Sequence, residues 1–219
     1  AANARRPLVV STTEPPATLE TASALPRFGF EATQAGVDRR GVLDLAQLEH
    51  ALATPTLVVG LIQANNEPGA VQRVPAAATL AHGVGALLHV DAAQSAGKIS
   101  VDVAALGADL LTLAGHKLYA PKGVGALYVR SGVALEPFIH GAGQESGRRA
   151  GTENVPYIVA LGAACRIARE GLAANAAHMA AMRDRLWSSL HTALGSRAEL
   201  NGHPQDRLPN TLNVSLAGC

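Results

Sequence analysis

The sequence predicts an α/β protein with a mostly parallel, mixed sheet of the seven-stranded type and helices on both faces. Short apolar runs alternate with helical patterns along the 219 residues, as in successive βαβ units. The side chains are 48% apolar but only 3% aromatic. We therefore expect a core built mainly from Ala, Leu and Val. Such small side chains let helices pack closely on a sheet.

Local signals place the elements of the N-terminal half. Pro16 suits the first turn of a helix, and Asp44 is expected to cap a helix that carries three leucines on one stripe. The composition of Asn65 to Gly69 marks a loop after a buried strand. In chain order we predict a strand at 8–11, a helix at 16–25, a strand at 30–34, a helix after Asp44 and a strand at 57–62.

The second half continues the alternation and ends in a long Ala-rich region. Val155–Leu194 is predicted to form one or two helices, broken near Gly171. Residues 1–200 are expected to form a large domain and 201–219 the start of a second one. We predict helices at 75–82 and 103–106, and strands at 86–90, 109–113, 123–129 and 208–216.

Composition excludes several classes of protein. The net charge is +1 with acids and bases interspersed, which argues against nucleic acid as a partner. No apolar stretch has the length of a membrane span, and the first residues do not read as a signal peptide. Cys165 and Cys219 form no CxxC pair, and the eight histidines show no metal-ligand spacing. We therefore expect no metal site and a reducing, cytoplasmic setting.

Polar residues follow three predicted strands closely: Asn66, Asp91 and the pair His116 and Lys117. Parallel strands bring their carboxyl ends to one edge, where ligands bind. Taken singly, Asp91 reads as a turn or cap residue and Lys117 as a surface lysine. Taken together, an acid and an amine at one crevice suit pyridoxal phosphate (PLP), because the lysine forms a Schiff base and the acid keeps the pyridine nitrogen protonated.

Other polar residues extend this prediction. Gln94 and Asn66 are placed to donate to the ring oxygen. His116 is placed to reach the phosphate or, equally, to serve as a structural hydrogen-bond donor. A second polar cluster at 141–154 combines glycines with Arg149 and Thr152, which suits an anion or, equally, a solvated loop. No dinucleotide fingerprint or P-loop is present.

Five stretches carry a resemblance to a known family. The chain resembles the cysteine desulfurase and selenocysteine lyase group of the class V aminotransferase family, whose members are PLP enzymes of fold-type I. AGTEN and RLPNT lean slightly towards the selenocysteine lyase branch and leave the branch open. The matching stretches are QANNEPG (63–69), HVDAAQSAGK (89–98), DLLTLAGHKLYAPKGVGALYVR (109–130), GAGQESGRRAGTENVP (141–156) and RLPNTLNVSL (207–216).

The resemblance assigns a role to each candidate residue. It implies a homodimer that removes sulfur or selenium from cysteine or selenocysteine, leaves alanine, and passes the sulfur to a mobile cysteine and an acceptor protein. By this similarity Lys117 is the Schiff-base lysine, Asp91 pairs with the pyridinium, Gln94 and Asn66 contact the ring oxygen and substrate, His116 binds the phosphate, Thr152 reaches the phosphate in the neighbouring subunit, and Arg149 belongs to the same interface loop.

The sequence also departs from the family pattern. Pro15 stands where a histidine stacks on the ring, and Ala114 where a serine often binds phosphate. Cys219 lies in the wrong place to accept sulfur, and Cys165 is expected in the core. We therefore expect an incomplete large domain with weak or no turnover alone and an unpaired strand at 211–216. The alternatives are a non-catalytic PLP-binding scaffold and a class V aminotransferase with another substrate.

Overall fold

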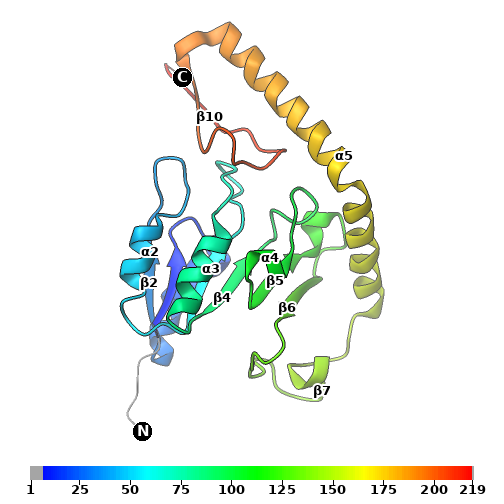
Figure 1. The fold of residues 1–219 in the computed structure, drawn as a ribbon. Coiled ribbons are helices and arrows are strands. Elements are labelled where there is room, and N and C mark those ends of the chain that lie inside the picture. The colour runs from blue at the N-terminus through cyan, green and yellow to red at the C-terminus, as the bar shows by residue number, and fades with distance from the viewer. Residues whose placement is uncertain (1–6, 219) are drawn as a thin grey trace.

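The main sheet has six strands in the order β2-β1-β3-β4-β5-β6 (Figure 1). The computed structural model describes residues 7–218. The first five strands are mutually parallel, and β6 runs antiparallel to β5. The prediction of a mostly parallel, mixed α/β sheet is confirmed. The strands are β1 Pro7–Ser11, β2 Glu31–Ala35, β3 Val58–Ile62, β4 Leu87–Asp91, β5 Leu110–Ala114 and β6 Gly125–Val129.

Helices cover both faces of this sheet. One face buries Val9, Val59 and Leu88 against α2 (Leu45–Ala51), α3 (Val74–Gly83) and α4 (Val103–Leu106). On the other face, α1 (Pro16–Ala24) approaches the sheet at Gly60, where an added Cβ would lie 3.3 Å from Val10 and 3.9 Å from Thr18. The missing side chain at position 60 therefore lets α1 sit close to the strands.

Two aspartates cap helices, and for Asp44 this confirms the prediction from sequence. The Asp44 carboxylate accepts the amides of Ala46 and Gln47, at 2.9 and 3.3 Å, and so caps α2. Asp102 caps α4 in the same way. These bonds satisfy amides that have no partner inside the helix, which explains why the short helices start where they do.

The long helix α5 (Val155–Leu194) runs through Gly171 without interruption. The expected break there is wrong. A glycine costs a helix only about 1 kcal/mol relative to alanine, and the Ala-rich neighbours favour helix throughout. The N-terminal half of α5 packs through Leu161 and Ala164 against Ala96 and Leu118. Leu161 is the one residue of this helix that is buried.

The predicted final strand at 208–216 does not join the main sheet, which has six strands within the described residues. Only β10 (Val214–Leu216) is extended, and it pairs antiparallel with β9 (Ala198–Leu200). The strand therefore has one partner, against expectation, while its other edge is unpaired among the described residues. The sequence signal at 198–200 is too short to have predicted the partner strand.

The segment between β9 and β10 folds back onto the loop that follows β3. The Leu208 amide donates to the Gly69 carbonyl at 2.8 Å, and the buried Arg207 donates through Nη2 to the Pro68 carbonyl at 3.1 Å. An added Cβ at Gly202 would lie 2.4 Å from the same Pro68 oxygen. These contacts fix the loop that carries Asn66.

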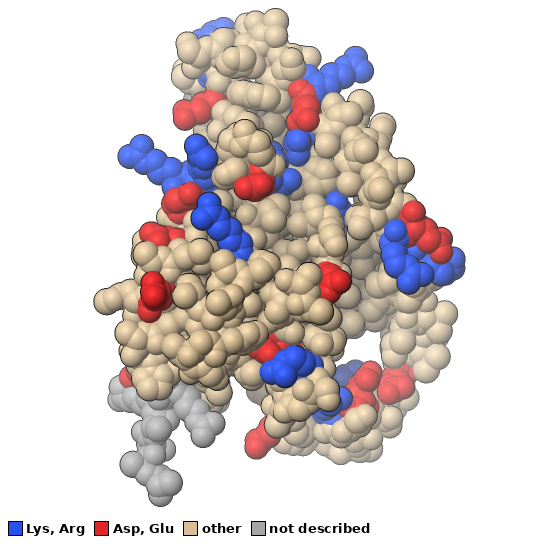
Figure 2. Space-filling model, viewed as in Figure 1, with Lys and Arg blue, Asp and Glu red and all other residues tan. Residues whose placement is uncertain are grey.

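The visible surface mixes both signs of charge. Figure 2 shows lysines and arginines interspersed with acids and no extended patch of one sign on this face. Within the described part of the chain, no helix combines the length and apolar character needed to cross a bilayer.

Candidate cofactor site

Asp91 is the last residue of β4 and stands at the carboxyl edge of the sheet. It lies between Ile62 of β3 and Thr112 of β5 in the strand register. The side chain is half-buried, and its Oδ1 accepts the Ala93 amide at 2.8 Å. No ion pair joins it to a lysine, arginine or histidine among residues 7–218. A half-buried carboxylate without a basic partner is stabilised when a cationic ligand binds to it.

His89 lies two residues before Asp91 and therefore on the same face of β4. Its Nε2 is 2.7 Å from the Thr112 hydroxyl. Burial lowers the pKa of His89, although the Asp91 carboxylate opposes this effect. His89 is therefore neutral near pH 7 and leaves the charge of Asp91 uncompensated. Sequence reasoning did not single out His89, although its spacing from Asp91 places both on one face.

The loops after β1 and β3 are tied together beside Asp91. The buried Asn65 donates through Nδ2 to the Thr13 carbonyl at 2.9 Å, and buried Glu14 accepts the Ile62 amide at 2.6 Å. The predicted residue Asn66 is the next one along and is exposed at this edge. Asn65 thus holds the loop, while the side chain of Asn66 stays available to a ligand.

Gln94 lies in the turn that follows Asp91 and is half-buried. The turn is held by Ser95, whose hydroxyl donates to Gln63 Oε1 at 2.6 Å, and by Lys98, whose Nζ donates to the Gln94 carbonyl at 2.9 Å. Burial, aided by the charge of Lys117, lowers the pKa of Lys98. The structure therefore brings Asp91 and Gln94 together on one short, well-bonded segment.

Lys117 and His116 lie in a single 3₁₀ turn, Gly115–Leu118, directly after β5, and both are exposed. An added Cβ at Gly115 would lie 2.6 Å from the Val124 carbonyl, so only glycine fits where this turn begins. Lys117 lines a groove of about 700 Å³ between this turn and α5, together with Lys98. Asp91 is not among the residues that line this groove. That Asp91 and Lys117 face one ligand stays a prediction.

Arg149 and Thr152 are not brought to this edge. They belong to a separate hairpin of β7 (Gly143–Gln144) and β8 (Arg149–Ala150) and to the loop after it, and both side chains are exposed. In Figure 1 the hairpin projects away from the helices that cover the sheet. Their predicted action on a neighbouring subunit remains a prediction.

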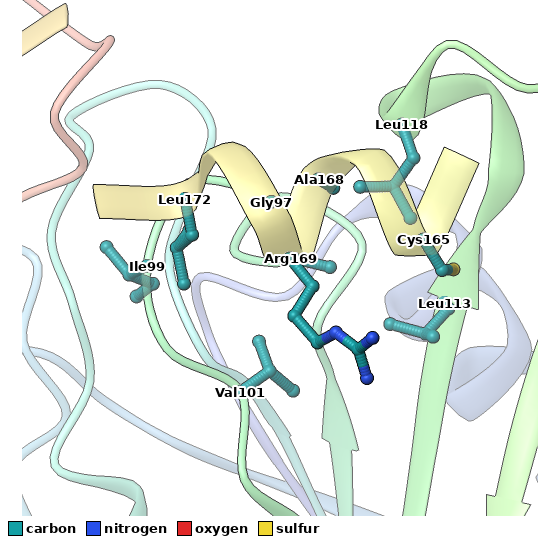
Figure 3. Close-up of a pocket in the computed structure, with 10 residues that line it drawn as sticks. Gly97, Ile99, Val101, Leu113, Leu118, Cys165, Ala168, Arg169 and Leu172 are labelled. Atoms are coloured by element: carbon teal, nitrogen blue, oxygen red, sulfur yellow. The ribbon is translucent and has the colours of Figure 1, made fainter. Parts of the chain in front are cut away.

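Cys165 is half-buried in an apolar cavity of about 240 Å³ between α5 and the segment after β4. Figure 3 shows its sulfur beside Leu113, with Leu118 above and Arg169 one turn further along the helix. Cys165 packs against the small cluster around Leu161, which supports a structural role. Cys219 lies outside the described residues.

The two departures from the family pattern lie at the same edge as Asp91. Pro15 is the residue before α1, and Ala114 ends β5. Neither side chain can donate a hydrogen bond or a proton. The groups present at the edge nevertheless fit PLP, because Asp91 offers the unpaired carboxylate that a pyridinium requires, and the Glu14 Oε2 atom beside it is buried without a hydrogen-bond partner.

The fold and this edge together define an α/β protein with a candidate cofactor site at the carboxyl ends of parallel strands. The family model described as aminotransferase class-V matches residues 2–219, and the chain belongs to that family. PLP is the cofactor of class V enzymes.

Curated relatives narrow the likeness to cysteine desulfurases. Cysteine desulfurase IscS of Colwellia psychrerythraea is 42% identical over 95% of this chain and 52% of its own length. A cysteine desulfurase of Gluconacetobacter diazotrophicus is 45% identical over 97% of this chain and 53% of its own length. The chain therefore spans about half the length of the curated relatives it matches.

Solved structures agree with the described fold. A NifS-like protein superposes with a TM-score of 0.91 at 40% identity, and 97% of this chain and 58% of that chain are covered. A structure described as SspA in complex with cysteine gives 0.82 at 32% identity, with 97% and 58% covered. The resemblance to this group is thus confirmed.

Proposed function

We propose that this chain forms the PLP-binding part of a cysteine desulfurase, which takes sulfur from cysteine and leaves alanine. The observation that carries the proposal is the half-buried Asp91 carboxylate at the carboxyl edge of the sheet, which has no basic partner among residues 7–218. Identity of 42 to 45% to cysteine desulfurases supports the choice of substrate class.

Each residue then has a defined task. Bound PLP supplies a ring that accepts electrons from the substrate. Asp91 would hold the ring nitrogen as a cation, and Gln94 and Asn66 would donate to the ring oxygen. His116 would bind the phosphate, and Lys117 would supply the amine that anchors the cofactor.

We also propose that the site is completed in a homodimer. Arg149 on the hairpin and Thr152 in the loop after it are both exposed and away from Asp91, which supports an interface loop in which Thr152 reaches the partner's phosphate. Selenocysteine as a substrate, transfer of sulfur to an acceptor protein and a cytoplasmic setting are further parts of this proposal, on the sequence grounds given above.

A non-catalytic PLP-binding protein is a second candidate, favoured by Pro15. A proline cannot move a proton where the family has a histidine. Ala114 likewise cannot hydrogen-bond a phosphate, because its side chain has no donor. A protein of this kind would bind PLP through Asp91 and Lys117 and release no sulfide.

Absorbance and sulfide assays on the full chain separate these functions. Lys117→Ala should abolish the near-visible absorbance of bound PLP, while Lys122→Ala, five residues on, should keep it. Cysteine should then yield alanine and sulfide in the wild type. Bound PLP without sulfide would favour the second candidate, and no PLP binding at all would refute both.

A further inference from the structure

Glu14 is a buried acid at the same edge of the sheet to which the proposed function gives no task. Its residue is 4% exposed, and its Oε1 accepts the Ile62 amide at 2.6 Å. Its Oε2 is buried and has no hydrogen-bond partner in the part of the chain that the structure describes. An ionised carboxylate with an unsatisfied oxygen is costly in such a place, so the geometry favours a proton on Oε2.

The environment of Glu14 is coupled to Asp91 through β3. The amide that Glu14 accepts belongs to Ile62, which is the register partner of Asp91, and the Gln63 amide donates to the Asp91 carbonyl at 2.8 Å. β3 itself carries no titratable side chain, and β4 carries His89 and Asp91. His89 is hydrogen-bonded to Thr112. Asp91 is therefore the group on β4 whose negative charge acts on the Glu14 carboxyl.

The electrostatics agree with this geometry. Burial raises the pKa of the Glu14 carboxyl from 4.5 to about 7, partly opposed by the Ile62 amide and reinforced by the Asp91 carboxylate. Two carboxylates that repel one another cannot both be ionised at little cost. A cation placed on Asp91 removes that repulsion and also attracts a second negative charge.

We propose that Glu14 is a proton-exchanging positioning residue of the cofactor site, partly protonated in the apoprotein near pH 7 and more fully ionised once a pyridinium pairs with Asp91. This inference rests on the proposed function. The O–H bond at Oε2 breaks, the proton passes to a buffer base in solvent, and both electrons of the bond stay on the carboxylate. Binding of PLP therefore releases a proton that comes from neither the cofactor nor Lys117.

Calorimetry of PLP binding to the full-chain apoprotein tests this inference. Titrations in two buffers with different enthalpies of ionisation give the number of protons released. Near pH 7 the wild type should release more protons than Glu14→Gln, by up to about half a proton, because Glu14 is about half protonated there. The glutamine keeps an acceptor for the Ile62 amide and cannot ionise.

A matched variant and a pH series complete the design. Glu20→Gln changes an exposed acid on α1 and should leave the count as in the wild type. In a pH series on the wild type, the protons that Glu14 contributes to the count should disappear at about two pH units above 7, where Glu14 is already ionised before PLP binds. This series keeps the test decisive if Glu14→Gln does not fold. Equal counts for wild type and Glu14→Gln, or an unchanged count across the series, overturn the inference, whereas a wild type that binds no PLP overturns the proposed function as well.

Discussion

Replacing Glu14 by glutamine should change how the stability of the apoprotein depends on pH. The carboxyl has a pKa of about 7 in the folded chain and 4.5 as its ordinary value. The unfolded state therefore loses the proton first as pH rises, and the folded wild type is progressively destabilised between these two values. Because one pKa unit corresponds to about 1.4 kcal/mol, the full cost is about 3 kcal/mol at alkaline pH. Glu14 is 4% exposed, so water does not screen this cost away.

Urea unfolding followed by circular dichroism measures this effect without any cofactor. The free energy of unfolding of Glu14→Gln, minus that of the wild type, should rise by about 3 kcal/mol from about pH 4 to about pH 9. Contributions from other groups cancel in this difference. The exposed Glu20→Gln variant should show no such rise, because its side chain is hydrated in both states. A flat difference for Glu14→Gln would mean that the carboxyl is ionised or hydrated in the folded chain, and the reasoning would fail.

Three further substitutions probe what supports the site, each measured by urea unfolding. Asp109→Ala should lower the free energy of unfolding by about 3 kcal/mol. The fully buried carboxylate accepts hydrogen bonds from the Leu88 amide and from Arg130 Nε, which lies 2.6 Å from Asp109 Oδ1. A loss below about 1 kcal/mol would contradict this role. Leu88→Ala should cost about 3 kcal/mol by leaving a cavity at a position with no exposed surface. Gly202→Ala should destabilise the chain because its Cβ would meet the Pro68 carbonyl, whereas Gly83→Ala, with open space around it, should not.

The elements with strong local signals were predictable from sequence. Asp44 caps α2 through bonds to amides two and three residues away, and the apolar run before Asn65 forms β3. Asp91 and Lys117 follow neighbouring strands, because β4 and β5 are adjacent in both the chain and the sheet. In such βαβ units sequence order carries over into spatial order, so the edge that holds the candidate residues could be anticipated.

Features that depend on distant contacts could not be anticipated. Glu14 becomes a buried acid because β3 supplies an amide from 48 residues further along the chain, and no local pattern marks that pairing. The β9 partner of β10 is three residues long and has no periodic signal. At Gly171 a local rule predicted a break, but the weak cost of one glycine is outweighed by alanine-rich neighbours in a helix of 40 residues.

The charges at the carboxyl edge explain why a cationic ring suits it. Burial keeps His89 neutral, Glu14 holds its proton up to about pH 7, and Asp91 therefore carries the charge of this cluster alone. In the proposed site, a neutral ring nitrogen would leave the half-buried Asp91 carboxylate uncompensated. A protonated nitrogen would compensate it and would also reduce the repulsion between Asp91 and Glu14. The cluster thus favours the protonated form of the ring over the neutral form, which is the form that draws electrons from a substrate.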